Sequence, residues 1–221
     1  MNLSRRLLLL ALAASPALAA APAEPKPVRI AVLYFDVLTQ DVELTAFSKG
    51  LAAMMITDLA TAQGVQVVER DRIEAILAEL KLGESRFADK SNLAKIGKLL
   101  NANFLVTGTL IKAGKVQSVE LRLFNAETSL VTHTHRTKLK DDDVFEAEQS
   151  CVESVLKSMD KLKGTLGARA PLPYSTAVKY SQALDAKDRK DKVGAAKLLK
   201  EVVAERPEFA LAKLDLATLT D

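Results

Sequence analysis

The two histidines of the chain, His133 and His135, alternate within one stretch of extended character. Side chains two residues apart on a strand point to the same face, so the two imidazoles could bind one metal ion. Asp141–Asp143 follow closely, but no cysteine joins them and the spacing sets no third ligand. We therefore favour two exposed residues on an edge strand, and we predict no metal site.

A second set of polar residues lies where strands are predicted to end. Asp36 closes an apolar run, the position at which α/β sheets place ligand-binding residues. For the charge cluster Glu69–Arg72, a hydrogen-bonded corner or helix cap is favoured over a binding site. The sequence holds no GxGxxG, Walker or GxSxG motif, so no phosphate cradle or nucleophile elbow is indicated. We expect no catalytic residues, no cofactor and no enzymatic activity.

The cysteine and two of the methionines are expected to lie in the hydrophobic core rather than to form reactive or binding sites. Cys151, the one cysteine, cannot form an internal disulfide and shares a helical face with Val152, Val155, Leu156, Met159 and Leu162. A second stripe could serve as an adaptable partner surface, because methionine suits such contacts, but its helical spacing favours the core: Leu51, Met54, Met55 and Leu59.

The elements that position these residues form an α/β domain over 28–163. A strand over Val28–Asp36, a helix ending near Ala62 with Gly64 as its C-cap, and a strand over Val65–Arg70 predict a right-handed βαβ unit with parallel strands. Two helices follow, capped by Asp71 (with Glu74 three residues on) and by Ser91, on either side of a polar loop over 83–90.

The hydrophobic period then changes to two. Strands over Phe104–Lys112, Lys115–Phe124 and Leu130–Leu139 predict an antiparallel meander. A long helix over Val144–Lys163 follows, with carboxylates at its start, where the helix dipole favours them. The predicted fold class is α/β, with the βαβ unit and the meander in one mixed sheet.

The C-terminal part is predicted to be all-helical. Gly164–Pro173 is expected to be a linker, and helices are expected over 175–187, 192–204 and 209–218. The spacing of small, large and proline positions resembles one tetratricopeptide repeat: Ala183, Ala195, Leu199, Val202 and Pro207. Ala186 stands where that repeat usually has tyrosine. We expect this segment, 174–221, to dock on the α/β domain or on a second subunit.

The first residues predict export. Arg5 and Arg6 precede an apolar run over Leu7–Ala14, then Pro16 and a small-x-small site ending at Ala19. The run is too short to span a membrane, which takes roughly 20 apolar residues. We expect residues 1–19 to be a cleaved signal peptide, by the general secretory route rather than the twin-arginine route, followed by a linker over 20–27. No cysteine lies directly after the cleavage point, and Cys151 is far from it, so no lipid anchor is expected.

Charge excludes one class of partner. Removing the two leader arginines from 31 basic side chains leaves 29 against 28 acidic ones. Without a basic excess or interleaved aromatic residues, the chain does not look like a nucleic-acid binder. At 48% hydrophobic residues, it can bury a proper core.

Four blocks, in order, carry a resemblance to a known family. Over Val28–Phe124 the chain resembles the CsgG-type and TolB-N-terminal-like family of bacterial envelope proteins, to which FlgO and LpoB are related. The blocks are Ala31–Asp36, Leu51–Leu59, Val67–Leu82 and Lys95–Gly108.

The resemblance implies a non-enzymatic periplasmic protein that assembles or adapts envelope structures through protein–protein contacts, with self-association as in CsgG. Pore formation is not expected, because no segment offers the apolar hairpins that a membrane barrel needs. The alternative is a soluble component of an outer-membrane, curli-type secretion complex; a small-ligand receptor or an enzyme is disfavoured. The sequence does not choose among curli, flagellar and cell-wall systems.

Overall fold

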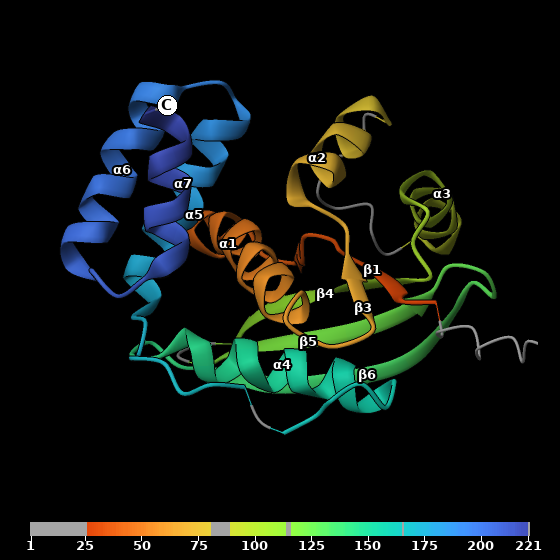
Figure 1. The fold of residues 1–221 in the computed structure, drawn as a ribbon. Coiled ribbons are helices and arrows are strands. Elements are labelled where there is room, and N and C mark those ends of the chain that lie inside the picture. The colour runs from red at the N-terminus through yellow and green to blue at the C-terminus, as the bar shows by residue number, and fades with distance from the viewer. Residues whose placement is uncertain (1–25, 81–88, 114–115, 165, 221) are drawn as a thin grey trace, which may run out of the picture.

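The strands of the protein form one mixed sheet. The computed structural model describes residues 26–80, 89–113, 116–164 and 166–220. The strand order is β3-β1-β4-β5-β6, with β2 beside β4. The helices of the described residues surround the sheet, and the last three gather on one side, next to α1 (Figure 1). The predicted fold class, a mixed α/β fold with a helical C-terminal region, is thus confirmed.

The βαβ unit consists of β1 (Val28–Val32), α1 (Val42–Leu59) and β3 (Val65–Val67). β1 pairs in parallel with β3, with Val28 opposite Val65, so this prediction is confirmed. The second strand is shorter than expected because Arg70 already begins the next helix.

The first strand does not run unbroken to Asp36. It ends at Val32, and the short β2 (Asp36–Val37) then rejoins the sheet beside β4. Between them, the N–H of Phe35 donates to Oγ of Ser48 at 2.6 Å, and this hydroxyl donates to the carbonyl of Phe35 at 2.9 Å. A side chain of α1 thus satisfies the backbone that leaves the sheet.

Three predicted caps are wrong, each by a few residues. Gly64 lies in the turn before β3 with φ +74°, whereas Ala60 closes α1 in a right-handed conformation. Glu69, not Asp71, is the N-cap of α2 (Arg70–Glu79), and it makes no side-chain cap bond. Glu74 accepts a hydrogen bond from the hydroxyl of Tyr34 instead of completing a capping box.

The third misplaced cap belongs to α3 (Lys90–Leu100). Asp89 is its N-cap and accepts from the N–H of Ser91 at 2.8 Å, so the helix begins before the residue expected to cap it. Most of the predicted polar loop, residues 83–88, lies outside the described residues.

The antiparallel meander is confirmed. It consists of β4 (Phe104–Ala113), β5 (Val116–Asn125) and β6 (Leu130–Leu139), with an irregularity of register between Leu123 and Phe124. Then α4 (Val144–Ser158) ends before the predicted Lys163 and starts from Asp143, whose carboxylate accepts from the N–H of Phe145.

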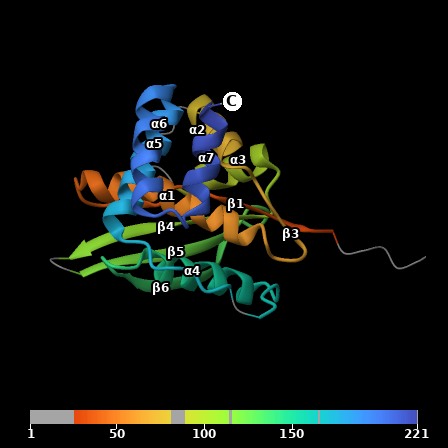
Figure 2. The same cartoon turned by 60° about the vertical axis from the view of Figure 1, so that its left-hand side comes forward.

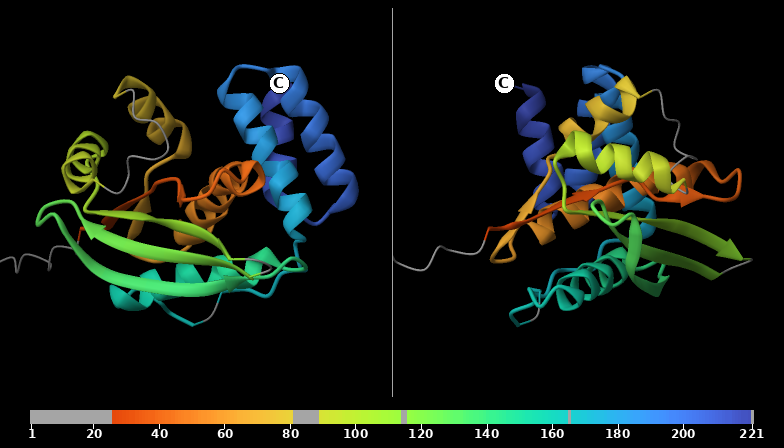
Figure 3. Two further views of the ribbon diagram at one scale, coloured as in Figure 1. Left: turned by 180° about the vertical axis from the view of Figure 1, so that it is seen from behind. Right: turned by 90° about the vertical axis from the view of Figure 1, so that its right-hand side faces the viewer.

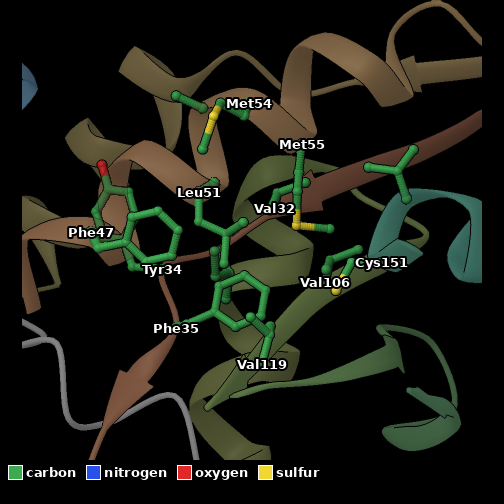
Figure 4. Close-up of a cluster of buried hydrophobic side chains, with 14 of the residues drawn as sticks. Val32, Tyr34, Phe35, Phe47, Leu51, Met54, Met55, Val106, Val119 and Cys151 are labelled. Carbon is green, nitrogen blue, oxygen red and sulfur yellow. The ribbon is translucent and has the colours of Figure 1, made fainter. Parts of the chain in front are cut away.

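Helices cover both faces of the sheet, and α3 and α4 lie on opposite sides of it (Figure 3). The four residues of the leucine and methionine stripe of α1 are fully buried, so the core interpretation is confirmed. Figure 4 labels Leu51, Met54 and Met55 among the buried side chains of the core, together with Val106, Val119 and Cys151. The thiol of Cys151 is buried as predicted.

The C-terminal helices are α5 (Tyr174–Asp188), α6 (Lys192–Glu205) and α7 (Ala210–Thr220), close to the predicted ranges. Figure 2 shows them standing beside α1. The connection before them is fastened to the α/β part: Leu172 is buried, and its carbonyl accepts from the N–H of Val144 at 2.9 Å.

Candidate functional site

A network of charged side chains joins α5 to the α/β part. Nζ of Lys49, on α1, donates to Asp185 at 2.9 Å and to Asp188 at 3.1 Å. The guanidinium of Arg70, the first residue of α2, donates through Nη1 and Nη2 to both carboxylate oxygens of Asp188, at 3.0 and 2.8 Å. Such bidentate pairs fix orientation as well as distance. The network therefore sets how α5 sits on α1 and α2.

The carboxylate partners of Lys49 and Arg70 outweigh the cost of burying the two cations. Burial lowers the pKa of Lys49, but its hydrogen bond to Asp185 and the charge of Asp188 outweigh this effect, so the pKa lies above its ordinary value. The pKa of Arg70 is raised for the same reason, with Asp188 as the main partner. The ring of Tyr34 lies 5.6 Å from Nζ of Lys49, and burial raises the pKa of its phenol far above the usual range. The ammonium group of Lys49 and the guanidinium group of Arg70 therefore stay charged through neutral pH.

The backbones of α1 and α5 come very close together beside this network. A Cβ atom on Gly50 would lie 2.0 Å from Oγ of Ser181, so any other residue here would force the side chain of Ser181 to move. The rings of Phe47 and Tyr174 pack at 5.2 Å between centroids on the same interface. The helical segment is thus docked on the α/β part, as expected for one of the two docking alternatives.

An apolar groove of about 580 Å³ opens next to the docked helix. Its walls come from the first turns of α1, the C-terminal half of α5 and the first turns of α6, and its lining residues are Gln40, Val42, Thr45, Ala46, Lys49, Gln182, Asp185, Ala186, Arg189, Asp191, Gly194 and Leu198. Val42 is 78% exposed at the rim, and Val193, next to the lining residue Gly194, is 83% exposed. Exposed apolar side chains beside a groove are typical of an interaction surface. We call this feature the α1–α6 groove.

A second charged cluster lies at the other end of α1. Nη2 of Arg169 donates to Asp58 and to Glu148, each at 2.7 Å, and its guanidinium stacks 4.0 Å from the ring centroid of Phe145. Glu148 is completely buried, and its Oε1 has no hydrogen-bond partner among the described residues. Burial, together with the charge of Asp58, raises the pKa of Glu148 to about 8. A pocket of about 420 Å³ opens beside this cluster.

The histidines do lie on one face of β6, but that face is turned to α4. Nε2 of His133 lies 2.7 Å from Oγ of Ser154, and Nε2 of His135 lies 2.8 Å from Oγ of Ser150. Both histidines are half-buried rather than exposed, and burial lowers the pKa of His135. No group of three metal-ligating side chains occurs in the described part of the chain, and Asp143 is used as a helix cap.

Asp36 is buried beside Thr109, its register partner in β4. Burial raises its pKa to about 6, against the opposing effect of Arg122, and Oδ1 has no hydrogen-bond partner within the described ranges. The structure brings Arg70 of the predicted charge cluster to the interface with α5, whereas Asp36 lies apart from the groove.

Sequence reasoning missed the partners of Arg70. Lys49 offered one signal, since it interrupts a run of residues that are otherwise suited to a core helix. Asp188 offered none, because 118 positions separate it from Arg70. Among the described helices, none is long and apolar enough to cross a membrane.

The chain is similar to several known proteins, in sequence and in fold. A curated relative, the putative adenylate cyclase 3 of Rhizobium meliloti (strain 1021), is 23% identical over 93% of this chain, and the chain spans about a third (35%) of that protein. Solved structures include lipoprotein GNA1162 from Neisseria meningitidis, with a TM-score of 0.43, 16% identity, and coverage of 52% of this chain and 81% of that one.

Two further structures are the C-terminal domain of LpoB from Salmonella enterica and TolB from Acinetobacter baumannii. The first has a TM-score of 0.39 and 11% identity, covering 54% of this chain and 87% of that one. The second has a TM-score of 0.43 and 13% identity, covering 63% of this chain and 30% of that one.

The sequence match to a protein family is the decisive one. The family described as the curli production assembly/transport component CsgG matches residues 12–120, a segment that runs into β5 and contains the βαβ unit, α2 and α3. The likeness of the C-terminal helices to a tetratricopeptide repeat stays a prediction. Residues 12–120, just under half of the chain, are therefore CsgG-like.

Proposed function

We propose that this protein is an assembly or adaptor protein of the bacterial cell envelope, that it acts through protein–protein contacts, and that it catalyses no reaction. The family supports the envelope setting, since its description is that of a curli production assembly/transport component. The α1–α6 groove carries the proposal of protein contacts, because it is apolar, open, and rimmed by exposed valines.

The docked helices give this role a physical basis. The groove has walls from both the α/β part and the C-terminal helices, so its shape depends on the network of Lys49, Arg70 and Asp188. Surfaces held in place before binding lose little entropy on binding, which favours affinity. An adaptor needs such a preformed surface.

The proposal includes the cellular location of the protein. Residues 1–25 lie outside the described residues. We place the mature protein in the periplasm, with cleavage after Ala19 and no lipid, a linker over 20–27, a CsgG-like domain over 28–163, a connection over 164–173 and a helical segment over 174–221. Self-association remains part of the proposal.

A second candidate follows from the family description, which names transport as well as assembly. In that case the chain is a component of an outer-membrane secretion complex and binds a pore-forming partner. Both candidates require a stable contact with another envelope protein, and the identity of that protein distinguishes them.

Cross-linking in intact cells tests the proposal. A photo-activated amino acid is placed singly at Val42, Leu130 and Leu214, three exposed apolar positions on different elements. We expect at least one position to give a cross-link to a single envelope protein, identified by mass spectrometry. Cross-links from none of the three positions, or adenylate cyclase activity of the purified chain, would contradict the proposed function.

A further inference from the structure

We propose that the α1–α6 groove binds an acidic amphipathic segment of a partner protein, with apolar side chains on its floor and carboxylates against the turn between α5 and α6. This inference deepens the proposed function and rests on it. It specifies the chemistry of the partner from the groove's own side chains.

Small side chains at the groove admit a peptide backbone. Ala46 of α1 and Ala186 of α5 line it, and Gly194 of α6 adds no side chain. Small residues at a helix surface let another backbone approach closely, while larger apolar side chains such as Leu198 provide area to bury. The groove is formed by three helices, so a helical segment could pack there as the fourth.

The rim provides apolar contacts on two sides. Val42 and Val193 belong to the first turns of α1 and α6, and both are more than three-quarters exposed. Neither side chain is needed to start its helix, because Asp41 and Asp191 are the N-caps. A partner that covers both valines would remove apolar surface from water, which is favourable in proportion to the area.

The turn between α5 and α6, beside the groove, carries an excess of positive charge that favours an acidic partner. The turn from Arg189 to Lys192 holds three cations and one carboxylate, and that carboxylate, Asp191, already accepts from the N–H of Gly194 at 2.9 Å. Lys190 and Lys192 are exposed, and neither takes part in an ion pair with another described residue.

The carboxylates nearest the floor are already paired. Asp185 is bound by Lys49 at 2.9 Å and by Arg189 at 3.0 Å. The N-terminal ends of α1 and α6, which also border this region, are already capped by the carboxylates of Asp41 and Asp191. Lys190 and Lys192 are thus left to pair with the carboxylates of a partner, whereas Asp185 and Asp191 already have partners within the chain.

The test uses three synthetic helical peptides and the purified mature chain. The probe has leucine at every third or fourth position and glutamate between; one control replaces each glutamate with lysine, and the other replaces each leucine with serine. Binding is followed by fluorescence anisotropy of the labelled peptides. We expect the acidic peptide to bind about tenfold more tightly than the lysine peptide, since a few exposed ion pairs together amount to that factor. The serine peptide should not bind.

Variants locate the binding. Val42→Asp and Val193→Asp should each weaken the acidic peptide at least tenfold, and Lys190→Asn with Lys192→Gln should remove its advantage over the lysine peptide. Asparagine is chosen because Lys190 has φ +66°, a conformation that asparagine tolerates. Leu214→Asp, at an apolar position on α7 that is 63% exposed, is the matched control and should leave binding unchanged.

Two results would overturn the inference. One is equal binding of the acidic and lysine peptides, or binding that survives Val42→Asp. The other is a dimer seen by light scattering that Val42→Asp dissociates, because a second copy of the chain would then occupy the groove. If neither peptide binds while cells show envelope cross-links from Leu130 or Leu214, the groove inference fails and the proposed function stands.

Discussion

Two clusters of charge anchor the C-terminal part of the chain to α1, and they differ in how their charges balance. In the first, two cations, Lys49 and Arg70, face Asp185 and Asp188. In the second, Arg169 alone faces two carboxyl groups, Asp58 and Glu148. The first cluster has as many cations as carboxyl groups, whereas the second has one carboxyl group in excess.

In the second cluster, the excess negative charge is removed by protonation of Glu148. Glu148 is fully buried, and its raised pKa of about 8 means that it is mostly neutral at pH 7. A buried charge without full pairing costs several kcal/mol, so protonation is the cheaper state. The two clusters therefore respond to different changes: the first to loss of a partner, the second to pH.

The largest effect should come from breaking the first cluster. Arg70→Met leaves Asp188 buried and dependent on Lys49 alone, and we expect a loss of about 3–5 kcal/mol in the free energy of unfolding, measured with urea. The side chains of Arg70 and Asp188 are only 11% and 10% exposed, so solvent cannot replace the lost partner.

A double variant gives the control for this loss. Arg70→Met with Asp188→Leu removes both charges of the bidentate pair, and it should be more stable than Arg70→Met alone. Equal stability of the single and double variants would mean that Asp188 is not buried against Arg70.

The second cluster predicts a pH dependence. The pKa of Glu148 is raised from 4.5 in the unfolded chain to about 8 in the folded one. The folded state therefore holds a proton that the unfolded state releases, so stability falls as pH rises from about 4.5 to about 8. We expect this group to account for a loss of about 2–4 kcal/mol across that window.

Glu148→Gln is the matched variant, because glutamine keeps the size and stays neutral. Its unfolding free energy should lose this slope between pH 5 and pH 8, while the slope of Arg70→Met should remain. A wild-type profile that rises through this window would show that Glu148 is ionised in the folded protein.

A smaller effect is expected where α1 and α5 cross. Gly50→Ala places a Cβ atom against Oγ of Ser181, which donates to the carbonyl of Ala177 at 2.7 Å. Overpacking of this kind costs about 1–3 kcal/mol, to be measured by urea unfolding. Adding Ser181→Ala should recover part of the loss; no recovery would place the clash elsewhere.

The smallest effect belongs to the groove. Val42→Asp and Val193→Asp should change the unfolding free energy by less than about 0.5 kcal/mol, because both side chains are exposed and an acidic residue suits the first turn of a helix. Thermal unfolding of each variant checks this. A larger loss would mean that these valines stabilise the fold rather than bind a partner.

The elements with a regular hydrophobic period were predicted correctly from the sequence. Alternation over β4, β5 and β6 and the apolar stripe of α1 indicated the sheet and the core, because periodicity reflects burial. Caps were misplaced because several polar residues stand together: Glu69 and Asp71 flank the same helix start, and only backbone geometry decides between them.

The groove and its anchors could not be predicted in the same way. Arg70 was noticed within a charge cluster, but its partner Asp188 lies in another segment, and no spacing rule joins them. Because Lys49 is charged, its residue type alone would place it at the surface, yet it is only 7% exposed. Contacts between distant segments depend on the docking of α5, which the local pattern does not encode.

The buried thiol of Cys151 has a use that does not depend on any partner. Burial, aided by the nearby Glu148, raises its pKa to about 12, so almost no thiolate is present to react. In an oxidising compartment this protects the lone cysteine from sulfenic acid formation and from mixed disulfides. A thiol-specific dye would label it only when the core opens, so the rate of labelling would report the frequency of that opening directly.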